Sequence, residues 1–89
     1  MNKQLVFDGD GFEDYLYWQT QDKKTLGKLN KLIKDAERNG YIGLGKPEAL
    51  SGDFAGWWSR EIDEKNRLIY RIKDGRLEIA KCKGHYNDK

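Results

Sequence analysis

The chain has 89 residues, of which 37% are hydrophobic and 36% charged, and its formal net charge is +2. This length suits one small domain with a thin core, and three Trp, five Tyr and three Phe supply the apolar area that disordered segments lack. A single cysteine excludes an intramolecular disulfide, and no run approaches the roughly 20 apolar residues of a membrane span. We therefore expect one domain over residues 1–89, reduced, cytoplasmic and without contact with a membrane.

The first part of the chain predicts a strand and a helix. Residues 4–7 are typical of a short strand, and the Asp-Gly repeat of residues 8–11 closes it with a turn. Asp8 or Asp10 then caps a helix that runs to about Gln21. The apolar stripe expected on this helix comprises Phe12, Tyr15, Leu16 and Gln19, with Trp18 at its edge.

A second helix is expected over about residues 23–39, between an N-cap at Asp22 and a stop at Gly40. Apolar residues recur at three and four positions, the pattern of an amphipathic helix: Leu26, Leu29, Leu32, Ile33 and Ala36. The remaining face carries Lys23, Lys24, Lys28, Lys31 and Lys34. The joint between the two helices is so tight that they should form an antiparallel hairpin.

The second half predicts a glycine-rich loop followed by strands. Residues 41–56 show no sustained period, and a loop of this length is suspected of function. Apolar and polar residues alternate in 57–62 and 67–72, and a last strand at 77–83 follows the hairpin signal Asp74-Gly75. The expected fold is α+β in the order βααβββ, with a mostly antiparallel four-stranded sheet and the helix pair packed on one face.

Several chemistries lack the residues that they need. One His and one Cys are too few for a metal site, and no glycine-rich phosphate loop opens a helix, so we expect neither a metal nor another cofactor. A nucleophile pair of Cys82 and His85 is conceivable. However, Cys82 alternates onto the same strand face as Ala80, which favours a buried, inert thiol.

A few polar residues remain without an evident structural role: Glu48 after Pro47 in the glycine-rich loop, Arg60 and Arg67 on neighbouring strands, and His85-Tyr86 beyond the last strand. Each has an ordinary alternative, namely a solvated carboxylate, surface ion pairs or a frayed tail. Together they match the cleavage of RNA by its own 2′-hydroxyl, which needs a base, cations for the phosphate and an acid, but no metal. The residue types alone leave both interpretations open.

Five groups of residues are recognisable in order and in spacing. They are DYLYWQ at 14–19, NKLIKD at 30–35, GLGKPEAL at 43–50, GWWSREI at 56–62 with NRLIY at 66–70, and CKGHY at 82–86. This series resembles the YoeB/Txe branch of the RelE/ParE toxin superfamily and covers residues 12–86. The resemblance implies a compact βααβββ fold and a ribosome-dependent endoribonuclease that cleaves messenger RNA in the A site. It also implies a cognate antitoxin of the YefM/Axe kind, and it is compatible with a homodimer.

Carried over by position, the resemblance implies a role for each candidate: Glu48 as general base, His85 as general acid, Arg67 in stabilising the phosphate, Tyr86 in positioning the substrate, and Arg60 and Lys46 in supporting contacts to phosphate. The lysines of the second helix (Lys23, Lys24, Lys28, Lys31 and Lys34) are candidates for contact with ribosomal RNA. A solvated helix face is the alternative for any one of them.

The chain departs from the family pattern at two internal positions. Glu61 stands where relatives often have a second basic residue, and Ser51 stands where a basic residue can occur. Two other functions stay open: a non-enzymatic toxin like the ParE branch, which binds a DNA topoisomerase, and a plain RNA-binding module. Glu48, Arg67 and the closing His85-Tyr86 argue against the first, because that branch does not need them.

Overall fold

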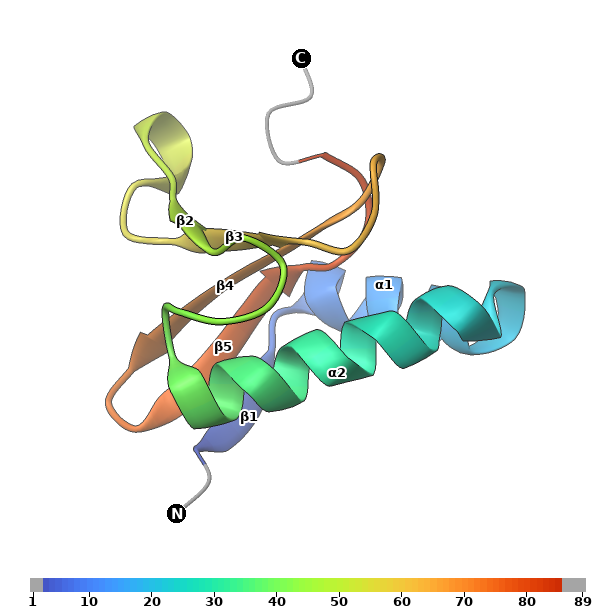
Figure 1. Cartoon of the computed structure of the whole chain (residues 1–89), viewed down its shortest axis with the longest axis horizontal. Coiled ribbons are helices and arrows are strands. Elements are labelled where there is room, and N and C mark those ends of the chain that lie inside the picture. Colours follow the sequence, from blue (N-terminus) through green and yellow to red (C-terminus); the bar gives the residue numbers. More distant parts are fainter. Residues whose placement is uncertain (1–2, 86–89) are drawn as a thin grey trace.

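Residues 3–85, which the computed structural model describes, form five strands, two α-helices and one short 3-10 helix (Figure 1). In chain order these are β1 (Gln4–Phe7), α1 (Gly9–Gln21), α2 (Lys23–Asn39), β2 (Glu48–Ala49), η1 (Gly52–Phe54), β3 (Trp58–Glu61), β4 (Arg67–Lys73) and β5 (Arg76–Lys81). No helix in this part of the chain is long and apolar enough to cross a membrane.

The strands form one sheet in the order β1-β5-β4-β3-β2. β1 runs parallel to β5, and the other neighbours are antiparallel. The predicted α+β class and mostly antiparallel sheet are therefore confirmed, but the expected strand count was too low by one. The additional strand is β2, where Glu48 pairs with Ser59. Two residues are too short to show an alternating pattern, so the sequence placed them in the loop.

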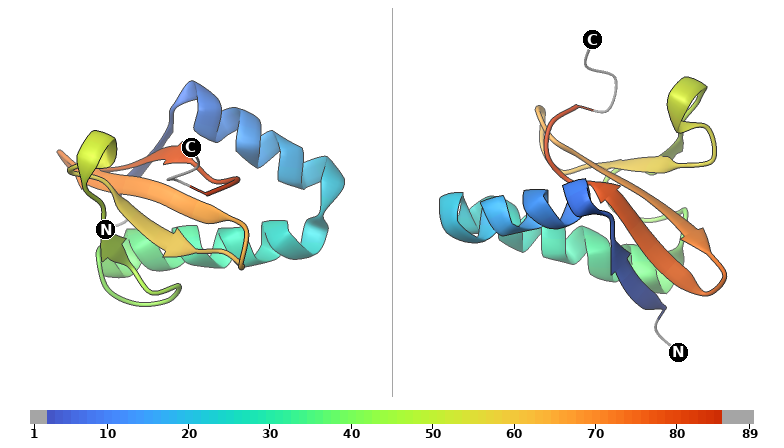
Figure 2. Two further views of the ribbon diagram at one scale, coloured as in Figure 1. Left: turned by 90° about the horizontal axis from the view of Figure 1, so that it is seen from above. Right: turned by 180° about the vertical axis from the view of Figure 1, so that it is seen from behind.

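The prediction for α2 is confirmed at both ends. The Asp22 carboxylate accepts a hydrogen bond of 3.1 Å from the Thr25 amide and caps the helix, and Gly40 ends it with a φ of +72°. The residues that α2 buries are Leu29, Leu32, Ile33 and Ala36. Figures 1 and 2 show α1 and α2 side by side in the expected antiparallel arrangement.

Helix α1 lies between the predicted boundaries, but it faces the core with a different stripe. Trp18 is a core residue at 6% exposure and the predicted Tyr15 packs against the core, whereas Phe12 is 49% and Leu16 38% exposed. Gly11 explains this orientation, because a Cβ at that position would lie 2.5 Å from the carbonyl oxygen of Ile79 in β5. The close approach at the glycine turns the Gly11–Trp18 side of the helix toward the sheet, where the indole donates a 2.8 Å hydrogen bond to the Cys82 carbonyl.

The two faces of the sheet are covered unequally. On the helix side, both helices close over a cluster that comprises Trp18, Leu29, Leu32, Ile33, Ala36, Ile62, Leu68, Tyr70, Leu77, Ile79 and Cys82. The other face carries only a small cluster of Leu50, Ile69 and Ala80, with Phe54 and Trp57 against it. At the end of β3 and the start of β4, this second face is not covered by the apolar cluster and carries polar side chains instead.

A β-bulge near the end of β5 changes the facing of its last residues. Tyr70 pairs with Ile79, but the next residue, Ile69, pairs with Lys81, so Ala80 is an extra residue. As a result Ala80 lies in the small cluster and Cys82 in the helix-side core, and the expectation that both share a face was wrong. The expected burial of Cys82 is confirmed at 0% exposure, and this burial raises the pKa of the thiol to about 12.

Candidate active site

Strand pairing brings two predicted site residues onto the same face of the sheet. Glu48 lies opposite Ser59, and Arg67 lies opposite Glu61. Because directly paired residues point the same way and alternate residues share a face, Glu48, Glu61 and Arg67 all project from the face away from the helices. The exposed Glu48 and the half-buried Arg67 thus lie on the two strands that flank β3, and their partners Ser59 and Glu61 are two residues apart along β3.

The turn between β3 and β4 holds the Arg67 side chain in place. Its Nη1 donates hydrogen bonds to the backbone oxygens of Asp63 at 2.7 Å and Asn66 at 3.2 Å. The Asp63 carboxylate fixes the turn in return by accepting from the amides of Lys65 and Asn66, both at 2.8 Å. Burial alone would raise the pKa of Asp63, but these hydrogen bonds outweigh it and the pKa lies below its ordinary value. The β3–β4 turn, itself fixed by hydrogen bonds, therefore holds the Arg67 guanidinium in one place.

The same turn fastens the chain that carries His85. The Arg67 amide donates to the Gly84 carbonyl at 3.0 Å, and the Gly84 amide donates to the Asn66 side-chain oxygen at 2.8 Å. These two bonds hold Gly84 against the start of β4, and the half-buried His85 is the next residue. Asn66 had no predicted role. Its only signal in the sequence was its place before Arg67 in the NRLIY segment. The predicted site residue Tyr86 lies outside the described residues.

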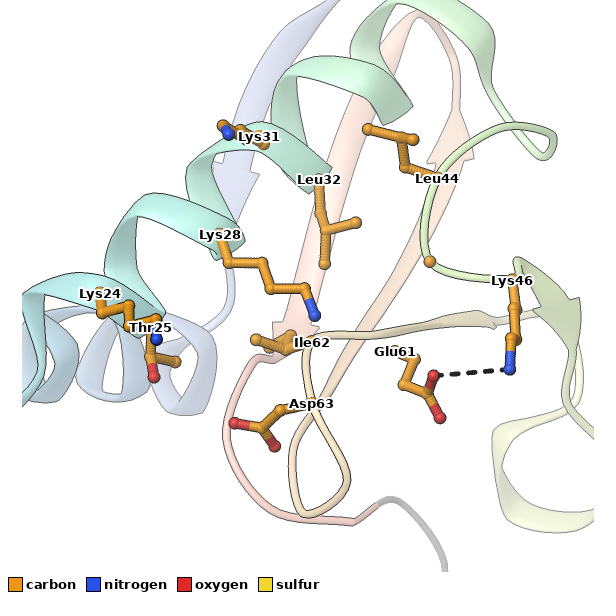
Figure 3. A pocket seen from close by; sticks show the side chains of 11 residues that line it. Lys24, Thr25, Lys28, Lys31, Leu32, Leu44, Lys46, Glu61, Ile62 and Asp63 are labelled. Carbon is orange, nitrogen blue, oxygen red and sulfur yellow. Dashed lines mark ion pairs between the residues drawn. The ribbon is translucent and has the colours of Figure 1, made fainter.

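Lys46 approaches the site from the glycine-rich loop. The Gly45 carbonyl accepts from the Glu61 amide at 2.7 Å and ties this loop to the end of β3. The Lys46 ammonium, whose side chain is 87% exposed, lies 3.9 Å from the Glu61 carboxylate (Figure 3). The other oxygen of that carboxylate lies 3.4 Å from Nη2 of Arg67. Two predicted phosphate-binding cations therefore converge, but with an acidic side chain between them.

Arg60 is not on this surface, and its expected contact with phosphate needs correction. Its side chain is fully buried at 0% exposure on the helix side of β3. There Nη1 forms a 2.6 Å ion pair with Asp35, and Nε donates to the Tyr70 hydroxyl at 2.9 Å. The remaining donors are taken by the backbone oxygens of Gly40, Ile42 and Leu44. The guanidinium is thus a buried joint that holds residues 40–44 against the sheet.

Asp35 completes this joint, although the sequence assigned it no role. Its carboxylate accepts from the Leu44 amide at 3.0 Å as well as from Arg60, and the hydrogen bond from Arg60 is the main reason why the pKa of Asp35 lies below its ordinary value. A Cβ at Gly43 would overlap this carboxylate. The loop that carries Lys46 and Glu48 is therefore held on the helix side of the sheet by Asp35 and Arg60.

The lysines of α2 line several neighbouring hollows rather than one groove. Three of them line a groove of about 740 Å³ that runs from α2 to the Lys46 loop and the end of β3 (Figure 3). They are Lys24, Lys28 and Lys31. Lys34 instead lines two smaller hollows elsewhere on α2, and Lys23 is an exposed residue at the start of the helix. Contact with ribosomal RNA stays a prediction for all five.

The site joins three kinds of group that RNA cleavage by an internal hydroxyl requires. A carboxylate (Glu48) and a cation (Arg67) lie on the same sheet face, from β2 and β4, and an imidazole (His85) follows Gly84, which is hydrogen-bonded to Arg67 at the start of β4. These are the chemical types that a general base, a phosphate ligand and a general acid need. Among residues 3–85, no group of three or more His, Cys, Asp or Glu could hold a metal ion.

Comparison with known proteins gives a consistent result. Residues 7–86 match the family model described as the YoeB-like toxin of bacterial type II toxin–antitoxin systems. Toxin YoeB of Escherichia coli K12 is 46% identical over 83 residues, which is 93% of this chain and 99% of the relative. Toxin RelK of Mycobacterium tuberculosis is 42% identical over 84 residues, covering 94% of this chain and 99% of the relative.

Solved structures agree with this match. A YoeB/ParE toxin from Agrobacterium tumefaciens superposes with a TM-score of 0.91 at 44% identity, covering 93% of this chain and 99% of the other. From Staphylococcus aureus, a heterotetrameric YoeB–YefM complex gives 0.87 and a YoeB dimer 0.89, each at 42% identity and covering 97% of this chain and 100% of the other. The chain belongs to the YoeB-like toxins of bacterial type II toxin–antitoxin systems.

Proposed function

We propose that this toxin is a ribosome-dependent endoribonuclease that cleaves messenger RNA in the A site without a metal. The observation that carries the proposal is that Glu48 and Arg67 lie on the same face of the sheet, while Gly84, the residue before His85, is hydrogen-bonded to Arg67. The other polar residues of the turn act by holding Arg67 and the His85 segment in place. The reaction belongs where ribosomes are, which is the cytoplasm.

In the proposed reaction, Glu48 accepts the proton of the ribose 2′-hydroxyl as its oxygen attacks the adjacent phosphorus. Arg67 donates hydrogen bonds to the phosphate oxygens as negative charge builds up on them, with Lys46 in support. His85 gives a proton to the departing 5′-oxygen, which leaves a 2′,3′-cyclic phosphate on the upstream fragment. Imidazole suits this step because its unperturbed pKa of about 6.5 lets it hold a proton near neutral pH and release it. Tyr86 stays a predicted residue for positioning the substrate.

The partners follow from the same proposal. Ribosome and messenger RNA supply the substrate, and the lysines of α2 are the proposed contacts with ribosomal RNA. We also propose a cognate antitoxin of the YefM kind, because the similar Staphylococcus aureus toxin is found in a complex with YefM. A homodimer is proposed on the same ground, since that toxin also forms a dimer.

The test is to map 5′ ends of messenger RNA in a translating extract that contains the wild-type toxin or a variant. We expect cuts within A-site codons for the wild type and a loss of about 10²- to 10⁴-fold in cleavage rate for both Glu48→Gln and His85→Gln. Glu64→Gln, an exposed carboxylate in the β3–β4 turn, is the matched control and should cleave like the wild type. Circular dichroism of all variants shows that the fold is kept.

Other outcomes lead to the alternatives. Full activity in both Glu48→Gln and His85→Gln would refute the assigned base and acid. No cuts from folded wild-type toxin would refute the ribonuclease proposal and favour a toxin that only binds. Inhibition of a DNA topoisomerase would then be the next measurement. Loss of toxicity in His85→Gln with ribosome binding retained would separate an enzyme from either kind of binder.

A further inference from the structure

The carboxylate of Glu61 lies between the two cations that the proposed reaction assigns to phosphate. One of its oxygens faces the Lys46 ammonium at 3.9 Å, and the other faces Nη2 of Arg67 at 3.4 Å. Figure 3 shows Glu61 reaching from the end of β3 toward Lys46, at the edge of the groove beneath α2. The arrangement of two negative oxygens between two cations is the one that a bridging phosphate would adopt.

Glu61 is not needed to hold Arg67 in place. The Asp63 and Asn66 carbonyls already hold Nη1 of Arg67 at 2.7 and 3.2 Å, so Glu61 contacts only the other terminal nitrogen. It is not needed to hold the loop of Lys46 either, because the Gly45 carbonyl binds the backbone amide of residue 61 and not its side chain. A purely structural role for this carboxylate is therefore weakly supported.

The pairs that Glu61 forms are loose. Distances of 3.4 and 3.9 Å exceed the roughly 2.7–2.9 Å of tight charge-assisted hydrogen bonds. The Glu61 side chain is 39% and the Lys46 side chain 87% exposed, so water screens that pair strongly, and it screens the pair with Arg67, which is 17% exposed, less. Exposed ion pairs of this kind are worth a factor of about 1.5 to 5 each. The carboxylate can therefore be displaced by a better anion at small cost.

We propose that Glu61 is an internal phosphate mimic that lowers the affinity of the site for RNA. In the free toxin its carboxylate occupies the position between Lys46 and Arg67, and an RNA phosphate must displace it to bind. This rests on the proposed function, since the displacing ligand is the backbone phosphate of the RNA substrate. Free RNA then competes poorly with the Glu61 carboxylate for Lys46 and Arg67. A messenger RNA held on the ribosome, by contrast, presents its phosphate at high effective concentration. Glu61 thereby contributes to the dependence on the ribosome.

A binding experiment tests the mimic without any cleavage. Inorganic phosphate is titrated into ¹⁵N-labelled toxin, and the Arg67 guanidinium and backbone signals report binding. We expect Glu61→Gln to lower the dissociation constant for phosphate by about two- to tenfold. Glu64→Gln removes the same charge three residues away and should leave it unchanged. Glu61→Asp keeps the charge and should stay nearer the wild type. Equal or weaker phosphate binding by folded Glu61→Gln would overturn the proposal, as would an equal gain in Glu64→Gln.

A kinetic experiment then tests the consequence for the substrate. On ribosomes programmed with messenger RNA, Glu61→Gln should lower KM by a similar factor with kcat kept, and should cleave free RNA more readily than the wild type. A residue that merely supports the structure would instead lower kcat and the melting temperature, and that result overturns the mimic. Failure of the wild type to cleave would refute the proposed function alone, because the phosphate titration still decides the role of Glu61.

Discussion

The Arg60 guanidinium is the most constrained polar group among the described residues. It is fully buried, and its nitrogens reach a carboxylate, a hydroxyl and three backbone oxygens. A buried cation is costly unless it is paired and its donors are satisfied, and here Asp35 supplies the charge. Burial also raises the pKa of its neighbour Tyr70, whose hydroxyl accepts from Nε of Arg60 and donates to the Gly40 carbonyl.

Arg60→Met is expected to lower the free energy of unfolding by about 3–5 kcal/mol, because it leaves Asp35 without its cation and the loop oxygens without donors. Urea denaturation followed by circular dichroism measures this. Lys73→Met, which removes an exposed cation from β4, is the matched control and should change stability by no more than about 0.5 kcal/mol. A loss below about 1 kcal/mol for Arg60→Met would contradict the structural role of this buried joint.

At the scale of elements, the orientation of α1 depends on a glycine more than on its apolar residues. The sequence pattern favoured a stripe through Phe12 and Leu16, but the structure buries the side of Gly11 and Trp18. A helix of few strongly apolar residues has a weak preference for one face. The steric fit at Gly11 against β5 therefore decides which face is turned inward.

Two glycine-to-alanine substitutions test this directly. Ala is favoured over Gly within a helix by about 1 kcal/mol, so Gly27→Ala, with open space around the added Cβ, should raise the free energy of unfolding by up to that amount. Gly11→Ala should lower it by about 1–3 kcal/mol, because the added methyl would lie against the backbone of Ile79. Thermal and urea denaturation of both variants measure the contrast. Stabilisation by both substitutions would mean that the contact at Gly11 does not orient the helix.

For the molecule as a whole, several carboxylates link stability to pH. Among the residues that the structure describes, four carboxylates have pKa values below their ordinary 3.8 (Asp) or 4.5 (Glu). They are Asp22, Asp35, Asp63 and Glu78. A lowered pKa means that the unfolded chain takes up these protons first, so the stabilisation is complete above the ordinary values and is lost as pH falls through the folded ones. Asp14 contributes to the pH dependence of stability with the opposite sign, because burial raises its pKa. It therefore offsets part of the stability that the four lowered carboxylates lose at low pH.

We therefore expect the urea midpoint of unfolding to hold near neutral pH and to fall steadily as pH drops below about 4.5, where the lowered carboxylates begin to be protonated. Asp35→Asn should show a shallower fall below about pH 4, because it removes one of these groups, although its stability at neutral pH is lower from the start. A midpoint that stays constant down to about pH 3 would contradict this linkage.

Local signals in the sequence determined much of the fold. The caps and period of α2, the Asp74-Gly75 turn and the alternation of β3 and β4 act over a few residues, so the sequence alone is enough to recognise them. Asp74 and Gly75 indeed adopt φ values of +52° and +75°. The two-residue β2, the bulge at Ala80 and the rotation of α1 depend on contacts with distant strands. No local pattern encodes such contacts.

The same division holds for the site. The sequence alone singled out Glu48, Arg67 and His85, because local segments resemble a known family, and their roles stay proposals. Only the tertiary structure decided which face of the sheet the helices cover, so that Arg60 faces the helices and Arg67 the open face. The partner of Arg60, Asp35, comes from α2, which is distant in the sequence. Only the tertiary structure placed Glu61 between Lys46 and Arg67. The physical reason is that charge is read from the sequence, whereas burial and pairing depend on segments that are distant in the chain.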